Sequence, residues 1–193
     1  MDISEKEKFD TAFKLHREGK TAEAEKAYIK ILNTKPDNYE VLNLLGLFYL
    51  SQNKRKEAEE YITKALSFNK NSYFYENLAR VYIQEKSFDK ACKILEEAIN
   101  TCNCGFEIYF LLGLSYKNNI QYEEAENAYL KALEINPKSE KACFNLASLY
   151  LFLNKPEKAI EYFTKCLEIN PNDKEVLYLS LIHISEPTRR SYI

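Results

Sequence analysis

The chain repeats itself about every 34 residues, and this repeat restricts its fold more than any other feature. An alanine recurs once per period, at Ala24, Ala58, Ala91, Ala125 and Ala159. Twelve residues before each of them stands another small residue: Ala12, Gly46, Ala79, Gly113 or Ala147. A unit of this length cannot bury its apolar face alone, so we expect neighbouring units to stack into one continuous core.

Large side chains accompany these small residues at helical spacing. Three residues after the first small residue of each unit come Leu15, Tyr49, Tyr82, Tyr116 and Tyr150. Four residues after the alanine come Tyr28, Ile62, Leu95, Tyr129 and Phe163. The spacing predicts two helices of about fourteen residues per unit, which the small residues allow to approach closely. Pro36, Pro137 and Pro171 mark the ends of three second helices, because proline has no backbone N–H to continue them.

This pattern resembles the tetratricopeptide repeat (TPR) family over five units: 5–38, 39–71, 72–105, 106–139 and 140–173. The fourth unit matches the family most fully, with Tyr109, Leu112, Gly113, Tyr116, Ala125, Tyr129, Ala132 and Pro137. The first departs most, since Lys8 and Thr11 stand where a large apolar pair is usual. The resemblance implies an all-α fold, a right-handed α-solenoid (superhelix) of stacked antiparallel helix pairs.

The pattern fails near the C-terminus. Residues 174–178 are interpreted as the start of a truncated sixth unit, and Ser180 and Leu181 do not continue it. The stretch 179–189, LSLIHISEPTR, resembles a one-frame translation of a sequencing-library adapter. We therefore expect 179–193 to be a non-native tail and the natural protein to be longer. The alternative is a native capping helix.

Charge and cysteine content restrict the partners and the compartment. The chain has 27 basic and 29 acidic side chains, a balance that argues against a nucleic-acid partner. No stretch approaches the roughly 18 apolar residues of a membrane span, so no membrane partner is predicted. Five cysteines, an odd number, without an export signal indicate reduced thiols, and we expect a cytoplasmic protein.

Catalytic groups are scarce in the sequence. His16 is the only histidine before the tail, and beside Arg17 and Glu18 it is expected to be solvated. The four glycines are scattered singly, so no phosphate-binding loop is predicted. The sequence thus predicts no catalytic residue and no cofactor, and we expect that the chain is not an enzyme.

Two further clusters are assigned ordinary roles. Cys102 and Cys104, with Cys92 nearby, lack the second close pair that a zinc site needs, so no metal is predicted. Three carboxylates lie at a predicted helix start, where they favour the positive dipole end and solubility: Glu123, Glu124 and Glu126.

Function is therefore expected on a surface. In the TPR family the first helix of each unit lines the inner, concave wall, and the resemblance places twenty residues of this chain there. Ten of the twenty are large and apolar, which is typical of an interaction site for a protein or peptide partner. The candidate peptide-binding residues are Phe9, Phe13, Leu47, Leu50, Tyr73, Arg80, Phe110, Leu114, Lys117, Lys141, Phe144 and Leu151.

The roles within this set differ. We expect the four phenylalanines to be anchor pockets and the three cations to fix the direction of a bound segment by charge. The alternative is that several of these side chains turn inward to support the superhelix, or contact a second chain.

One TPR subtype is excluded by its own residues. Co-chaperones that hold the acidic tail of heat-shock chaperones use two lysines, two asparagines and an arginine at set positions. If this pattern starts at the first unit, the matching residues are Phe9, Phe13, Leu44, Tyr73 and Asn77. If it starts at the second unit, they are Asn43, Leu47, Asn77, Glu107 and Leu111. Neither set contains a cation, so that tail is not expected as a partner.

A second hypothesis comes from the segment 15–46, which resembles bacterial chains whose repeats precede a glycosyltransferase domain. O-linked N-acetylglucosamine transferases carry an asparagine at position 6 of successive repeats. The corresponding residues here are Asp10, Leu44, Asn77, Leu111 and Asn145, so the series is broken. On this hypothesis the chain is the N-terminal arm of a truncated enzyme, inactive as this fragment.

Overall fold

The computed structural model describes residues 3–174 and 176–178, with side chains from residue 7 onward. Over this part every regular element is a helix, which confirms the all-α prediction. The helices are α1 (Ile3–Arg17), α2 (Thr21–Thr34), α3 (Tyr39–Ser51), α4 (Arg55–Phe68), α5 (Ser72–Gln84), α6 (Phe88–Thr101), α7 (Phe106–Asn118), α8 (Tyr122–Ile135), α9 (Glu140–Phe152) and α10 (Pro156–Ile169).

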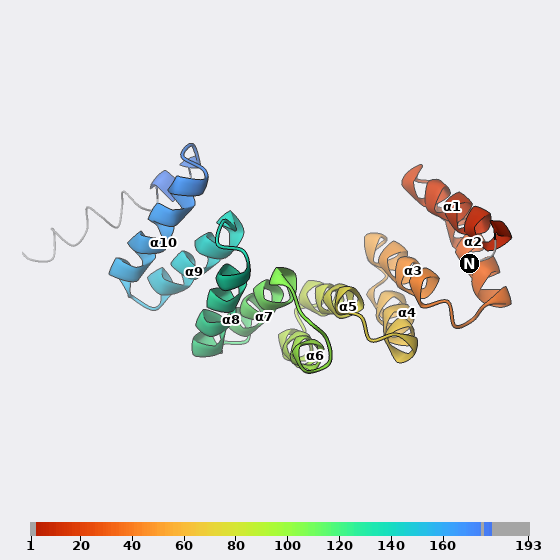
Figure 1. Cartoon of the computed structure of the whole chain (residues 1–193), viewed down its shortest axis with the longest axis horizontal. Coiled ribbons are helices and arrows are strands. Elements are labelled where there is room, and N and C mark those ends of the chain that lie inside the picture. Colours follow the sequence, from red (N-terminus) through yellow and green to blue (C-terminus); the bar gives the residue numbers. More distant parts are fainter. Residues whose placement is uncertain (1–2, 175, 179–193) are drawn as a thin grey trace, which may run out of the picture. The chain divides into compact units, whose positions relative to one another are not determined.

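The helices form two compact units, one within residues 1–103 and one within residues 104–193. Unit 1 contains α1 to α6, coloured red to yellow-green in Figure 1, and unit 2 contains α7 to α10, coloured green to blue. Within each unit the two helices of a repeat pack as a pair, and the second packs on the first helix of the next repeat. This is the stacking that a TPR solenoid requires.

Glycine permits the closest helix approaches. A β-carbon on Gly113 of α7 would lie 2.6 Å from the Tyr129 ring of α8, and one on Gly46 of α3 would lie 2.5 Å from Ile62 of α4. The five alanines of the repeat are fully buried at the matching sites of the second helices. The small columns therefore set the helix–helix distance, and large side chains fill the remaining space.

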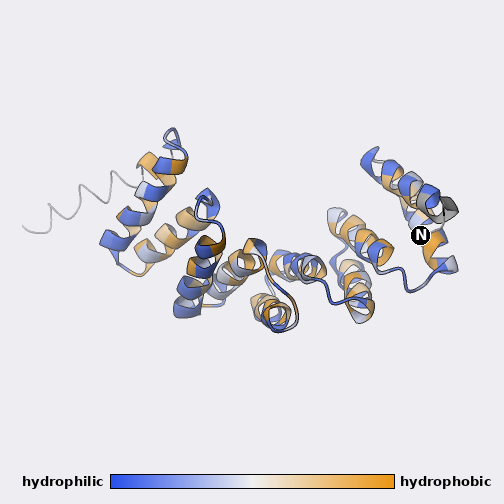
Figure 2. Cartoon of the chain, in the orientation of Figure 1, coloured by the Kyte–Doolittle hydropathy of each residue, from blue (hydrophilic) through white to orange (hydrophobic). Residues whose placement is uncertain are grey.

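The helices have apolar and polar faces, visible as orange and blue stripes in Figure 2. Asn38 and Ser139 directly precede α3 and α9 as N-caps, and their side chains accept hydrogen bonds from the backbone N–H of Val41 and Ala142. Such caps satisfy donors that a helix start leaves unpaired.

The turn between the two helices of each repeat contains a residue with positive φ. The five residues are Gly19, Asn53, Lys86, Ile120 and Asn154, with φ of 73°, 62°, 59°, 64° and 55°. Glycine and asparagine suit this left-handed conformation, whereas a β-branched side chain is unfavourable there.

After α10, residues 174 and 176–178 are helical, and Val176 is buried. The expected tail, 179–193, lies outside the described residues. The non-native origin of this tail and the truncation of a sixth repeat remain predictions.

Candidate functional site

The twelve candidate residues are spread over both units and differ in exposure. Phe13, Tyr73 and Lys141 are exposed, and Phe110 is buried. The other eight are half-buried: Phe9, Leu47, Leu50, Arg80, Leu114, Lys117, Phe144 and Leu151. Partly exposed apolar residues thus lie on the first helices of repeats in both units.

Phe110 does not lie on the surface, and the expectation that it is an open anchor pocket is wrong. Its side chain is only 9% exposed. The ring lies 6.0 Å from that of Tyr129 and stacks on Phe106 at 5.7 Å. Because Gly113 lets α7 and α8 approach closely, Phe110 is covered by the second helix of its own repeat. Phe144 is partly covered in the same way, with its ring 6.0 Å from Phe163.

Two of the three candidate cations are already paired within their own units. Arg80 donates from Nε and Nη2 to the same Glu76 oxygen, at 3.1 and 3.0 Å. Lys141 donates to both oxygens of Glu107, at 2.8 and 3.1 Å. Its ammonium also lies 4.6 Å from the centre of the Phe110 ring, a cation–π geometry. A ligand carboxylate would have to compete with these partners.

Lys117 differs from the other two cations. It is half-buried on α7, and burial lowers the pKa of its ammonium. In the described part of the chain no carboxylate pairs with it. A charge that is partly removed from water without a partner is unfavourable, so this lysine would gain from an external acid.

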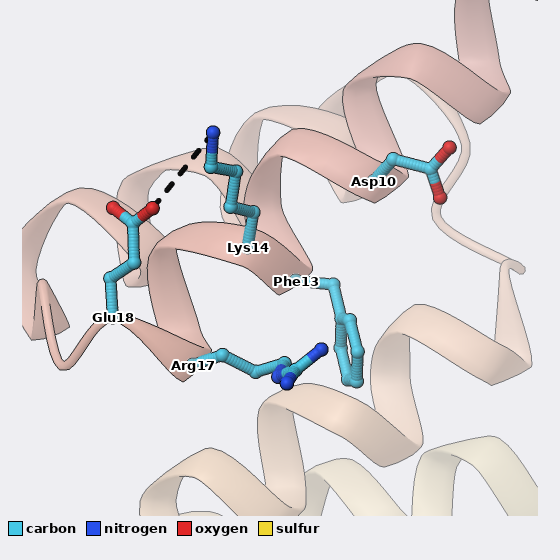
Figure 3. Close-up of a pocket in the computed structure, with 5 residues that line it drawn as sticks. All are labelled: Asp10, Phe13, Lys14, Arg17 and Glu18. Carbon is cyan, nitrogen blue, oxygen red and sulfur yellow. Dashed lines mark ion pairs between the residues drawn. The ribbon is translucent and has the colours of Figure 1, made fainter.

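In unit 1 the exposed Phe13 lines a hollow on α1. The hollow has a volume of about 510 Å³ and is lined by Asp10, Phe13, Lys14, Arg17 and Glu18. Figure 3 shows the ring of Phe13 and the guanidinium of Arg17 on one side of the helix, with Lys14 and Glu18 on another. Lys14 and Glu18 are 3.9 Å apart. The hollow therefore combines an open aromatic ring with charges of both signs.

His16 is not the solvated residue that the sequence suggests. Its ring meets Phe48 edge-on at 5.2 Å, and its Nδ1 lies 3.3 Å from the Tyr28 hydroxyl. Partial burial lowers its pKa. His16 therefore joins the first two repeats by packing, an arrangement that depends on α3 and is not visible in its own helix.

Glu126 also has a role that the sequence interpretation missed. Its Oε1 accepts a hydrogen bond from the Tyr150 hydroxyl at 2.8 Å and one from Lys158 at 3.2 Å. Glu123 and Glu124, by contrast, are exposed in the first turn of α8, as expected. The same tie recurs in unit 1, where Tyr49 donates to Glu25 at 2.6 Å and Tyr82 to Glu59 at 2.9 Å.

These tyrosine–glutamate bonds connect consecutive repeats. Each glutamate directly follows the recurring alanine of one repeat. Each tyrosine stands three residues after the first small residue of the next repeat. That coincidence was the available sequence signal. Burial and the hydrogen bonds to the glutamates raise the pKa of Tyr49, Tyr82 and Tyr150.

The raised tyrosine pKa values predict that the free energy of unfolding decreases at alkaline pH. Burial raises the pKa of Tyr28 to about 12, whereas an unfolded tyrosine has a pKa of about 10. The contribution of such groups is complete below pH 10 and is lost as the pH rises towards 12, because the unfolded chain releases these protons first. The midpoint of urea unfolding, followed by circular dichroism, should fall across this window. Tyr150→Phe should weaken the dependence, and a midpoint independent of pH would contradict it.

Among the residues with described positions, no group of three or more His, Cys, Asp or Glu side chains is arranged to hold a metal ion. The five cysteines are free thiols. Over the same residues, no helix has both the length and the apolar character needed to cross a membrane.

Solved structures with the same architecture include MamA and YrrB. A MamA structure superposes with a TM-score of 0.78 at 26% identity, covering 91% of this chain and 98% of that one. YrrB, a TPR protein with an unusual peptide-binding site, superposes with a TM-score of 0.74 at 22% identity, covering 89% of each chain.

Two curated relatives share the repeats. The BBSome complex member bbs-4 of Caenorhabditis elegans is 26% identical over 160 residues, 82% of this chain and 35% of that protein. The human protein O-mannosyl-transferase TMTC3 is 28% identical over 172 residues, 88% of this chain and 17% of that protein. The chain therefore spans about a third or less of the length of these relatives.

Family models give the most direct assignment. Three tetratricopeptide repeat models match this sequence, at residues 15–76, at 72–102 and 106–139, and at 140–173. Together they cover nearly all of the helical array, and the helix pairs have the expected packing. The chain belongs to the tetratricopeptide repeat family.

Proposed function

We propose that this chain is a non-catalytic scaffold that binds a protein or peptide segment on the first helices of its repeats. The observation that carries the proposal is the open apolar surface at those positions. Phe13 is 40% exposed and Tyr73 is 51% exposed, although neither is needed to pair the helices. Exposed apolar side chains that form a patch are typical of interaction sites.

The two units offer different chemistry to such a segment. In unit 1, Phe9 and Phe13 stack at 6.4 Å beside the hollow on α1, which suits an aromatic or aliphatic side chain. In unit 2, Leu114 and Leu151 are half-buried, with Lys117 as a cation. An extended or helical segment could use these as anchors, with apolar contacts for affinity and charge for direction. The presence of a peptide-binding site in YrrB is in keeping with this use of the fold.

The second hypothesis, an arm of a glycosyltransferase, has one observation in its favour. The match to TMTC3 extends over most of this chain but only 17% of that enzyme, so the likeness is in the repeats. The asparagine series argues against a ligand-binding role like that in O-linked N-acetylglucosamine transferases. Asn77 is buried and donates to Asn43 at 2.9 Å, and Asn145 donates to the Lys141 carbonyl at 2.7 Å. A sequencing read past the codon for Tyr178 would decide whether an enzyme domain follows.

Peptide binding can be tested with the purified chain. A phage-displayed library of random 16-residue peptides would be selected on the immobilised protein, and enriched peptides resynthesised with a fluorescent label. The double variant Phe13→Ser/Tyr73→Ser should weaken unit 1 binders about tenfold or more, since truncating an anchor typically costs over 1 kcal/mol. Phe68→Ser is the matched control, because Phe68 is 50% exposed but lies at the end of a second helix.

The outcomes separate the hypotheses. Enriched peptides that lose affinity in the double variant, but not in Phe68→Ser, support the scaffold. If no peptide is enriched, or if the double variant binds every enriched peptide normally and Lys117 and Leu114 variants do too, the proposal is wrong. Light scattering over a range of concentrations tests whether the surface instead binds a second copy.

A further inference from the structure

In unit 2, the turn after α7 and the end of α9 carry apolar side chains that are not explained by folding. Ile120 lies in the turn, Tyr122 begins α8, and Phe152 ends α9. Lys117 lies in the last turn of α7, and its carbonyl accepts a hydrogen bond from the Ile120 N–H at 3.3 Å. These four residues are called the turn patch below.

Ile120 is unfavourable for folding in two ways. It has a φ of 64°, a conformation that is costly for a β-branched residue, and its side chain is 73% exposed. The matching turn residues of the other repeats are Gly19, Asn53, Lys86 and Asn154. Asparagine would therefore serve the turn better than isoleucine. Backbone conformations of this kind occur preferentially where a protein binds or acts.

Phe152 shows the same departure from its equivalents. Its side chain is 65% exposed, whereas the last residues of α3, α5 and α7 are the polar Ser51, Gln84 and Asn118. Its ring lies 5.0 Å from the ring of Tyr122. The contact joins the end of α9 to the start of α8, and Tyr122 follows Ile120 by two residues.

The charge at the patch indicates what would cover it. Lys117 is half-buried and lacks a carboxylate partner in the described part of unit 2. Lys155 and Lys158, which follow Phe152 in the sequence, are by contrast both paired with Glu126. Glu123 and Glu124 follow Tyr122, but both are exposed to water and lie at the favourable end of the α8 dipole. An incoming carboxylate would relieve the partly desolvated ammonium of Lys117.

We propose that the turn patch docks a segment of a partner protein in which an acidic residue lies beside a large apolar residue. The carboxylate pairs with Lys117, and the apolar side chain covers Ile120 and the exposed face of Phe152. The inference rests on the proposed scaffold function and specifies the partner chemistry in unit 2.

The test uses the full chain and peptides enriched from the random library. We expect a class of peptides with Asp or Glu within two residues of a large apolar side chain. Their affinity should fall at least tenfold in Ile120→Asn/Phe152→Asn and in Lys117→Gln, and should be unchanged in Phe68→Asn. Ile120→Asn/Phe152→Asn should keep or raise the melting temperature, because both substitutions restore the residue type of equivalent positions.

Other results would overturn the inference in distinguishable ways. If enriched peptides lack the acidic residue, or bind all turn-patch variants normally while depending on Phe13 and Tyr73, the scaffold proposal stands and the patch does not. If no peptide is enriched, both fail. A loss of melting temperature in the double variant would make the patch structural, and a concentration-dependent mass abolished by it would make the occupant a second copy of this chain.

Discussion

Replacing Gly113 by valine is expected to destabilise unit 2, with a loss of about 3 kcal/mol in the free energy of unfolding. Even a single β-carbon at this position would lie 2.6 to 2.9 Å from three atoms of the Tyr129 ring. That ring is fully buried and is itself packed by Phe110, so it has little room to move. The helix pair α7–α8 must therefore separate, and the core contacts of both helices weaken together.

Urea titration followed by circular dichroism would measure the effect of this substitution. Gly105→Ala is the matched control, because Gly105 precedes α7 and an added β-carbon there meets no atom within 4 Å. The control should remain within about 1 kcal/mol of the parent protein. A Gly113→Val variant as stable as the parent would show that α7 and α8 do not pack as closely as the structure has them.

Phe110→Ser is expected to cost about 3 kcal/mol or more, because it removes a buried ring and leaves a cavity beside Tyr129. It also removes one of the two rings that face the Lys141 ammonium. The same substitution at Phe13 of α1 should cost less than about 1 kcal/mol, since much of that ring is already in water.

The comparison of the two variants distinguishes support of the fold from binding. The melting temperature and the helical signal should fall for Phe110→Ser and remain nearly unchanged for Phe13→Ser. If instead Phe110→Ser folds normally and loses a bound peptide, Phe110 is an anchor after all, and the packing argument at α7 is wrong.

Helix pairing could be predicted because its determinants lie within one repeat. Gly113, Ala125 and Tyr129 occur at spacings that place them on facing sides of two consecutive helices. Steric size alone then determines how closely those helices approach. The same local information predicts where the helices end, since proline follows α2, α8 and α10.

Contacts between repeats could not be predicted from the spacing of residues within one repeat. Tyr150 meets Glu126 across 24 residues, and His16 meets Phe48 across the boundary between the first two repeats. Periodicity identifies the apolar face of a helix, but not which neighbouring helix covers each side chain of it. Phe110 and Phe13 are therefore both expected to be anchors from the sequence, although one is buried and the other is open.

The repeat, the helix pairs and the family could be predicted from the sequence, because these depend on residue size at fixed spacing along one chain. The folded arrangement was needed to show that Phe110 belongs to the core, that Glu126 accepts a hydrogen bond from Tyr150, and that Lys117 lacks a carboxylate partner in the described part of unit 2. Burial and pairing depend on the residues that a neighbouring helix brings close in space, and spacing along the chain does not contain that information.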